Sequence, residues 1–200
     1  MVKVRPAESS DAERILEIYA PYILNTAFTF ETEVPGIEAF SQRIMNGLQR
    51  FPWIVCTVND TLAGYVYASP HREREAYQWT CECSVYIREE FKGNGIGKKL
   101  YGLLFQLLKM QGLKNVYAGI TLPNEASVRL HEKCGFRQFA TYDNIGYKLG
   151  SWQKVGWWKL QLSEYDLKPP PPVRFSLLDP DLIAPLFSGT ARQISSKLTG

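Results

Sequence analysis

The chain has 200 residues, of which 45% are hydrophobic and 22% are charged, and its formal net charge is +3. A chain of this length can bury most of its apolar surface in one core, so we expect one compact unit that needs no disulfide or metal. The small net charge excludes the strongly basic surface that is typical of nucleic-acid-binding proteins.

No stretch of the sequence predicts a membrane segment or a leader. The longest apolar runs, residues 53–58 and 103–108, are far shorter than the roughly 20 residues that a membrane span needs. Lys3 and Arg5 precede no hydrophobic segment of the signal-peptide type. We therefore expect a cytoplasmic protein with neither membrane nor nucleic acid among its partners.

Four cysteines stand at positions 56, 81, 83 and 134. Cys81 and Cys83 would project from the same face of one strand, so they are not placed to pair across strands. We interpret the four as reduced thiols of the core. A zinc site would need a second pair of ligands, for which only His71 and His131 are available elsewhere, and we expect no metal.

The first part of the chain alternates short strands with two helices. Residues 2–5 alternate as a strand, and the sequence from Ser10 to Glu13 has the composition of a capping box ahead of a helix. Residues 37–50 repeat apolar side chains at four-residue intervals, which predicts a second helix. The runs 53–58 and 62–68 flank a turn sequence and are typical of a hairpin.

The second part of the chain carries further strands and two more helices. Residues 77–87 alternate as a strand that leads into a glycine-rich segment, and the helical stripe that follows ends at Gly112. The other expected elements are a strand at 116–120, a helix at 124–133, and aromatic-rich strands at 136–145 and 152–162. The predicted order is βααβββαβαββ.

The composition changes beyond residue 162. Four consecutive prolines, residues 169–172, are followed by a short apolar cluster at residues 175–178. We divide the chain into a domain of residues 1–162 and a proline-rich C-terminal extension of residues 163–200. A disordered or loosely docked tail is the favoured interpretation of the extension, and a segment that packs on the core or on a second subunit is the alternative.

Three glycines alternate in the segment between the predicted strand at 77–87 and the next helix. Glycine lets the backbone turn sharply, so that its N–H groups can converge on one point. The dipole of the following helix and the nearby Lys99 add positive charge, which predicts an anion site suited to a pyrophosphate, with a plain flexible turn as the alternative. The segment consists of Lys92, Gly93, Asn94, Gly95, Ile96, Gly97 and Lys98.

The spacing of these glycines excludes two families of nucleotide site. A dinucleotide fingerprint would need glycine at position 98, which Lys98 occupies. A Walker loop would need four residues between its glycines and a Ser or Thr where Lys99 stands. The segment instead resembles the acetyl-CoA loop of the Gcn5-related N-acetyltransferases (GNAT), Gln/Arg-x-x-Gly-x-Gly/Ala. Lys92 fills the first place and keeps the charge without the planar fork of arginine.

Within that superfamily, residues 4–162 resemble the phosphinothricin N-acetyltransferases and related amino-acid N-acetyltransferases. The resemblance is carried by whole segments, residues 4–7, 51–53, 76–80, 122–124, 127–132 and 156–158. It implies an α/β (α+β) fold, in which helices flank a central mixed, mostly antiparallel sheet that splays at the strand carrying Glu82. It also implies a homodimer, which the aromatic-rich residues 152–158 would help to form, although packing within one sheet explains these residues almost as well.

The resemblance further implies acetyl-CoA as co-substrate, entering from one side of the sheet while the amine enters from the other. By position, residues 93–98 would hold the pyrophosphate, and Asn124 with Ser127 would form the far wall. The backbone amides that would hold the pantetheine arm are those of Val85, Tyr86 and Ile87.

Two titratable residues are candidates for the chemistry. Glu82 lies in mid-strand on the polar side of an apolar run, where a carboxylate is costly unless it is solvated, paired or used. It matches the active-site glutamate of the family, which implies a general base acting through water. His131 follows Asn124 and Ser127 by seven and four residues, so the three share a helical face. The resemblance implies that His131 is an acid or proton relay, and a helix-surface or capping histidine is the alternative.

Arg72, Arg74 and Tyr77 precede the strand of Glu82 and are candidates for binding the substrate. Guanidinium groups bind carboxylates and tetrahedral anions in a bidentate manner. Arg74 with Tyr77 matches the family's substrate loop. Alternatively, both arginines face solvent or pair with Glu73 and Glu75.

We therefore expect an enzyme that acetylates the α-amine of a small amino acid such as phosphinothricin, methionine sulfoximine or methionine sulfone. A second hypothesis keeps the chemistry and changes the acceptor to a protein N-terminus, a polyamine or an antibiotic. A third, from another class of function, is a non-catalytic acyl-CoA sensor.

Overall fold

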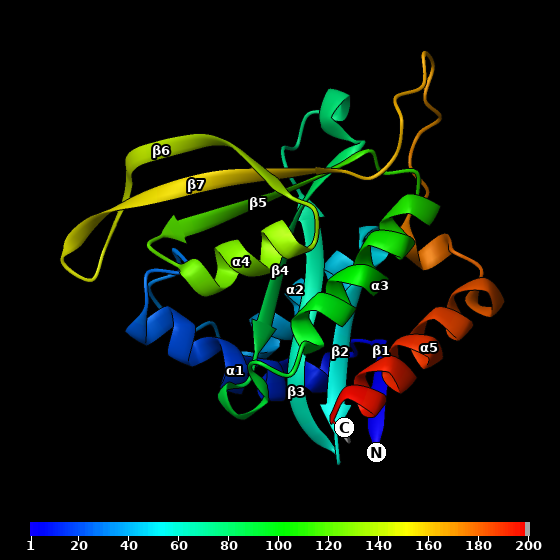
Figure 1. Ribbon diagram of the computed structural model, residues 1–200, viewed down its shortest axis with the longest axis horizontal. Coiled ribbons are helices and arrows are strands. Elements are labelled where there is room, and N and C mark those ends of the chain that lie inside the picture. The colour runs from blue at the N-terminus through cyan, green and yellow to red at the C-terminus, as the bar shows by residue number, and fades with distance from the viewer. Residues whose placement is uncertain (199–200) are drawn as a thin grey trace.

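The computed structural model describes residues 1–198, which contain a seven-stranded sheet in the order β1-β2-β3-β4-β5-β7-β6 (Figure 1). The strands are β1 Val2–Pro6, β2 Trp53–Val58, β3 Thr61–Pro70, β4 Thr80–Ile87, β5 Asn115–Leu122, β6 Arg137–Lys148 and β7 Ser151–Gln161. The helices are α1 Ala12–Asn25, α2 Ile37–Arg50, α3 Ile96–Met110, α4 Glu125–Lys133 and α5 Pro180–Leu198. The predicted order of elements is confirmed up to β7, and the predicted mixed, mostly antiparallel sheet is confirmed as well.

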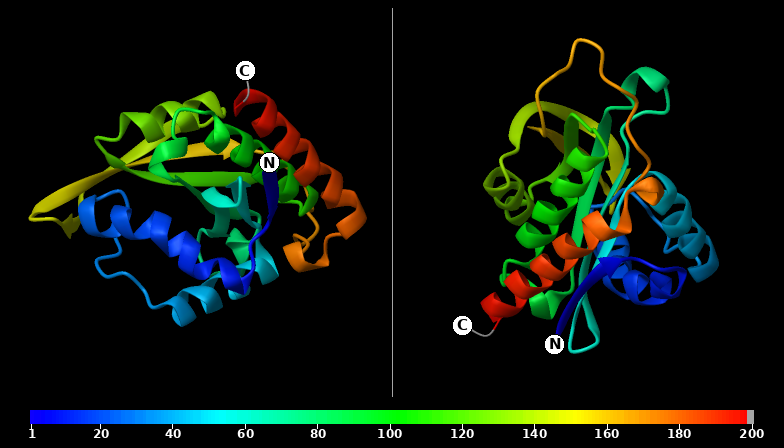
Figure 2. Two further views of the ribbon diagram at one scale, coloured as in Figure 1. Left: turned by 90° about the horizontal axis from the view of Figure 1, so that it is seen from below. Right: turned by 90° about the vertical axis from the view of Figure 1, so that its right-hand side faces the viewer.

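Helices cover both faces of the sheet (Figure 2). Alternation along the strands supplies each face with its own apolar cluster, because successive side chains point to opposite sides. Along β2, for example, Trp53 and Val55 pack in the cluster under α1 and α2, whereas Ile54 and Cys56 pack in the cluster under α3 and α5. Strands β2 and β3 are therefore buried on both faces, with a separate core on each side.

The sheet opens between β4 and β5, the one neighbouring pair that is parallel. Their pairing covers only Thr80 with Asn115, Cys81 with Val116, and Glu82 with Tyr117. Beyond Glu82 the two strands diverge, and β5 continues along β7 (Figure 1). The predicted splay at Glu82 is confirmed, and it leaves residues 83–87 of β4 without a strand on that side.

The predicted capping box from Ser10 to Glu13 is wrong. A 3-10 turn, Ser9–Asp11, precedes α1, and the reciprocal box is made by Glu8 and Asp11. The Asp11 carboxylate is buried and accepts two hydrogen bonds from the Arg5 guanidinium, at 2.6 and 2.8 Å. Burial alone would raise the pKa of Asp11, but these bonds and that from the Glu8 N–H hold the pKa below its usual value. Asp11 therefore joins β1 to α1.

The interpretation of the extension as a disordered or loosely docked tail is wrong for residues 180–198. They form α5, which packs against β1 and α3 and buries Phe187, Thr190 and Ile194 (Figure 1). The segment before it is also held, since Trp79 Nε1 donates to the Pro170 carbonyl at 2.8 Å. The helical spacing of the buried residues was masked by the serines and prolines around them.

All four cysteines are free thiols, as predicted, and three of them are buried. Within residues 1–198, no three His, Cys, Asp or Glu side chains gather as a metal site would require. In the same part of the chain, no helix combines the length and the apolar character that crossing a membrane demands.

Candidate active site

The glycine loop presents free backbone donors at the start of α3. Gly93 and Gly95 have φ angles of 80° and 76°, in the left-handed region that favours glycine, and Gly95 is the N-cap of α3. The first intrahelical bond runs from the Lys99 N–H to the Gly95 carbonyl. The N–H groups of residues 96–98 consequently have no backbone acceptor within residues 1–198, and they remain available to an anion.

A cavity of about 550 Å³ adjoins this loop and extends along the open edge of β4. Ser84 and Tyr86 from one face of β4 line it together with Cys83, Val85 and Ile87 from the other, so the cavity passes through the gap in the sheet. Of the residues predicted to hold a coenzyme, those that line it are Val85, Tyr86, Ile87, Lys92, Gly93, Gly95, Ile96, Gly97, Lys98, Asn124 and Ser127. Asn94 instead donates to the carbonyls of its own loop.

The cations around the cavity differ in their partners. Lys92 forms an ion pair with Glu89 at 2.6 Å and lies over the Tyr22 ring, and Arg129 pairs with Glu125. Lys98, Lys133 and Lys197 also line the cavity, and within residues 1–198 they form no ion pair. Glu89 thus partly neutralises the charge of Lys92, which was predicted to help hold the pyrophosphate. The positive charge at the cavity comes mainly from the other three lysines and from the N-terminus of α3.

His131 lies at the inner wall of the cavity in a chain of hydrogen bonds. Its Nδ1 lies 2.8 Å from the Ser127 carbonyl, which can only accept, so Nδ1 carries the proton. Its Nε2 lies 2.9 Å from the Tyr101 hydroxyl and accepts from it. His131 is 4% exposed, and burial lowers its pKa, which keeps the imidazole neutral. A helix-surface histidine is therefore excluded.

Tyr101 connects His131 to β4. Its role was not recognisable in the sequence, because Tyr101 occupies a position of α3 at which the pattern predicts a core side chain. Burial raises the pKa of Tyr101 well above its usual value and that of the Cys83 thiol beside it to about 12. Both groups therefore stay protonated. Asn124 caps α4 by accepting from the Ser127 N–H at 3.2 Å, so α4 brings Asn124, Ser127 and His131 to the cavity together.

Glu82 lies at the fork of the sheet, with its side chain about one-third exposed, and its Oε1 is 2.8 Å from His71 Nδ1. An ionised carboxylate can only accept, so His71 donates in this bond. The His71 ring stacks on Tyr117 at 4.9 Å and meets Tyr77 and Trp157 edge-on, each at 6.0 Å. These aromatic residues form a cluster around the His71 ring. Here we call it the aromatic cluster.

From the sequence alone, His71 stood out only as a possible metal ligand. The register of β3 and β4, in which Ser69 pairs with Glu82, places residue 71 beside the carboxylate. The long connection between the two strands hid this register. Of the predicted substrate residues, the structure brings Tyr77 to the aromatic cluster, whereas Arg72 and Arg74 are exposed and pair with neither Glu73 nor Glu75.

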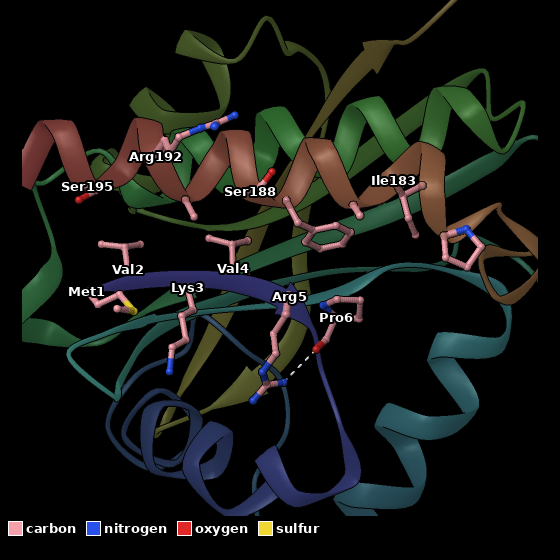
Figure 3. Close-up of a pocket in the computed structure, with 14 residues that line it drawn as sticks. Met1, Val2, Lys3, Val4, Arg5, Pro6, Ile183, Ser188, Arg192 and Ser195 are labelled. Carbon is pink, nitrogen blue, oxygen red and sulfur yellow. Dashed lines mark hydrogen bonds between the residues drawn. The ribbon is translucent and has the colours of Figure 1, made fainter.

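A second hollow, of about 730 Å³, lies between β1 and α5. Figure 3 shows Val2 and Val4 pointing toward α5, and Lys3 and Arg5 pointing to the other side of the strand. This groove shares no lining residue with the cavity at the glycine loop. The loop and the histidine network line the cavity along the open edge of β4, and the Glu82 pair lies at the fork where that edge begins, so this region is the candidate active site.

Comparison with known proteins agrees with this geometry. Residues 4–157 match the family model described as an acetyltransferase (GNAT) domain. A phosphinothricin N-acetyltransferase of Streptomyces viridochromogenes is 37% identical over 86% of this chain and 93% of its own. An L-methionine sulfoximine/L-methionine sulfone acetyltransferase of Salmonella typhimurium is 31% identical over 81% of this chain and 95% of its own. A phosphinothricin acetyltransferase of Sinorhizobium meliloti, solved in complex with acetyl-CoA, has 27% identity, covers 87% of this chain and 98% of its own, and superimposes with a TM-score of 0.79.

Proposed function

Since this chain belongs to the GNAT family and is an acetyl-CoA-dependent acetyltransferase, we propose that it acetylates the α-amine of a small amino acid. Phosphinothricin, methionine sulfoximine and methionine sulfone are the acceptors we propose, because they are the amino acids in the names of its relatives. The observation that carries the proposal is the position of Glu82, which is bonded to His71 at the fork between the coenzyme cavity and the aromatic cluster.

The described residues fit acetyl-CoA. The loop amides and the α3 N-terminus suit a pyrophosphate, and the unpaired edge of residues 85–87 offers backbone groups to the amides of a pantetheine arm. Acetyl-CoA supplies a thioester whose carbonyl carbon is attacked by the amine and whose thiolate departs. Asn124 and Ser127 would line the opposite wall.

Glu82 acts as the general base in this proposal. It removes one proton from the acceptor ammonium, directly or through water, and the neutral amine then forms the new N–C bond while the C–S bond breaks. The reference pKa of an α-amine is about 8, so roughly a tenth is already neutral at pH 7 and the base needs to supply only about 1 to 2 kcal/mol. Loss of Glu82 should therefore slow turnover without abolishing binding.

The attacking nitrogen loses a second proton as it becomes an amide, and in this proposal the Tyr101 hydroxyl gives one proton to the sulfur and is reprotonated by the one that the nitrogen loses. The departing thiolate must take one proton, and the Tyr101 hydroxyl is a protonated group on the cavity wall. His131 cannot offer its own proton directly, because Nδ1 donates to the Ser127 carbonyl and Nε2 accepts from Tyr101. To protonate the sulfur, the Tyr101 hydroxyl must turn away from His131 Nε2, so of the two roles considered for His131 we propose that of relay, which holds the Tyr101 hydroxyl until the thiolate forms.

Recognition of the amino acid is assigned to the residues near the aromatic cluster. We propose that Tyr77 borders the acceptor and that Arg74 or Arg72 moves in to bind its anionic end, because both guanidinium groups are exposed near it. Trp157 contributes an indole N–H that has no hydrogen-bond partner in the described part of the chain. An acceptor with a carboxylate and a second polar end suits this set of donors.

A thiol-release assay over a panel of amines tests the proposal. The panel should contain phosphinothricin, methionine sulfoximine, methionine sulfone, a polyamine, an aminoglycoside and a peptide N-terminus. We expect turnover with one or more of the amino acids, and a fall of about 5- to 30-fold in kcat for Glu82→Gln, which corresponds to a contribution of about 1 to 2 kcal/mol from the base. Turnover restricted to another amine would overturn the substrate class. Unchanged turnover in Glu82→Gln would overturn the mechanism. Coenzyme binding without any turnover would overturn the assignment as an amino-acid acetyltransferase.

We also propose a homodimer that forms through the β6–β7 hairpin. The hairpin extends away from the body of the molecule (Figure 1). Its apolar side chains that are more than half exposed are Phe139, Ile145, Tyr147, Leu149 and Trp152. An apolar set of this size on one projecting element is typical of an interaction surface.

For location we propose the cytoplasm, supported by the four free thiols. Cysteines that stay unpaired are typical of a reducing compartment. Cell fractionation with an antibody against the chain tests this, and recovery in an oxidising compartment or a membrane fraction would contradict it.

A further inference from the structure

The C-terminal helix brings a lysine to the glycine loop. Lys197 lines the coenzyme cavity although it lies about a hundred residues after the loop. A Cβ atom placed on Gly95 would come within 2.6 Å of Lys197 Nζ and 3.2 Å of its Cδ. The lysine side chain therefore extends along the residue that begins α3.

Contacts on both sides fix the position of Lys197. Ile194 is 1% exposed, and Leu198 packs against the same core cluster. One turn earlier, Gln193 accepts a hydrogen bond from Lys99 Nζ at 3.0 Å, which joins α5 to the first turn of α3. The end of α5 is thus anchored beside the loop, within reach of the Lys197 side chain.

The charges around Lys197 point to a negatively charged ligand. Among residues 1–198 no carboxylate forms an ion pair with Lys197, in contrast to Lys92 and Arg129 at the same cavity. The group that it faces, the N-terminus of α3, carries a partial positive charge of its own. Lys197 is exposed, so water screens the repulsion between the two positive groups, and an anion bound between or beside them would be attracted by both.

We propose that Lys197 is a phosphate-binding residue of the acetyl-CoA site, with its ammonium contacting phosphate groups of the coenzyme that the loop amides hold. The inference depends on acetyl-CoA as co-substrate and not on the identity of the amine. Because the family match ends at residue 157, this contact comes from the segment that we propose as an extension, residues 163–200, of an acetyltransferase domain at 1–162. The extension completes the coenzyme site.

Titration calorimetry with CoA at low salt tests the contact. We expect Lys197→Gln to weaken binding about five- to tenfold, Lys197→Arg to retain most of the affinity, and the difference to shrink as salt screens the exposed charge. Arg192→Gln is the matched control, because Arg192 is an exposed cation on the same helix that lines the β1 groove instead. It should bind CoA as the unmodified protein does.

Two further ligands locate the contact. If the loss in Lys197→Gln persists with 3′-dephospho-CoA, the lysine contacts the pyrophosphate, and if the loss disappears, it contacts the 3′-phosphate; either result supports the proposal. Equal CoA affinity of Lys197→Gln and the unmodified protein would overturn it. So would an equal loss in Arg192→Gln, or a loss that is also seen with pantetheine, which has no phosphate. None of these results depends on which amine is acetylated.

Discussion

Single residues at the fork of the sheet determine what the site can do. Glu82 is a partly exposed carboxylate, as many surface glutamates are. What distinguishes it is the His71 donor at 2.8 Å, which fixes one carboxylate oxygen and leaves the other for a ligand. The ring of His71 is in turn fixed by its stack on Tyr117. We regard His71 as a positioning residue, because it acts through Glu82.

Replacing His71 tests this role. His71→Phe keeps a ring that can stack on Tyr117 and removes the donor. Because Glu82 itself remains, we expect kcat to fall only about 5- to 20-fold, below the roughly 10²- to 10⁴-fold typical of general acid–base catalysis, with KM for acetyl-CoA unchanged. His71→Asn keeps an N–H donor and should recover part of the loss. Steady-state kinetics across pH 6 to 9 measures both. Equal activity in His71→Phe and the unmodified protein, or no recovery in His71→Asn, would refute the assignment.

Burial of His131 predicts how stability depends on pH. Its pKa in the folded chain is lowered below 6.5, whereas the unfolded chain keeps the usual value, so between the two values the unfolded chain binds the extra proton. Neutral His131 therefore contributes its full stabilisation above about pH 6.5, and this is lost as pH falls through the folded pKa, by at most about 1.4 kcal/mol per pH unit. Tyr101 and Cys83 do not titrate in this range.

Thermal unfolding between pH 8 and pH 5 measures this contribution. We expect Tm of the unmodified protein to fall with pH, and Tm of His131→Asn to fall less steeply, although it starts lower. Parallel curves for the two proteins would show that His131 is not the group responsible.

Among the elements, α5 is a helix that packs on the core although its sequence has only a weak apolar pattern. Its buried stripe consists of Phe187, Thr190 and Ile194, and Pro185 lies inside the helix. Because only one face is apolar and the partner surface on β1 and α3 is not evident from the sequence, local patterning alone favoured a loose tail. The strands and the other helices were predictable because their periodicity is strong and continuous.

A substitution in α5 tests its contribution to stability. Ile194→Ala removes a fully buried side chain and should lower the free energy of unfolding by about 2 to 5 kcal/mol, with a clear fall in Tm. Leu182→Ala, on the exposed side of the same helix, is the control and should change Tm little. A similar, small effect of both substitutions in calorimetry would mean that α5 does not pack as described.

At the scale of the whole molecule, the sequence specified the site only in part. The glycine loop, α4 and Glu82 were recognisable because each is a local pattern of residues. His71, Tyr101 and Lys197 were not, because their roles depend on the register of β3 and β4, on which face of α3 meets α4, and on where α5 lies. Local patterns reveal motifs, whereas contacts between distant segments require the fold.

The assembly is tested at the same scale. We expect the protein to be a dimer in multi-angle light scattering and Trp152→Ser to shift it toward monomer, since Trp152 is 63% exposed on the projecting hairpin. Leu177→Ser, at an exposed apolar residue outside the hairpin, should leave the dimer intact. A monomer at all concentrations, or a dimer unaffected by Trp152→Ser, would refute the proposed interface.

The gap between β4 and β5 also has a kinetic consequence. Because side chains from both faces of β4 line one cavity, a ligand that approaches from the α3 side of the sheet and a ligand that approaches from the α1 side can meet at the strand edge. Both can be bound at once, and neither needs to leave before the other arrives. Initial-rate plots at several fixed amine concentrations should therefore give intersecting lines, as in a ternary-complex mechanism, and not the parallel lines of an acetylated enzyme.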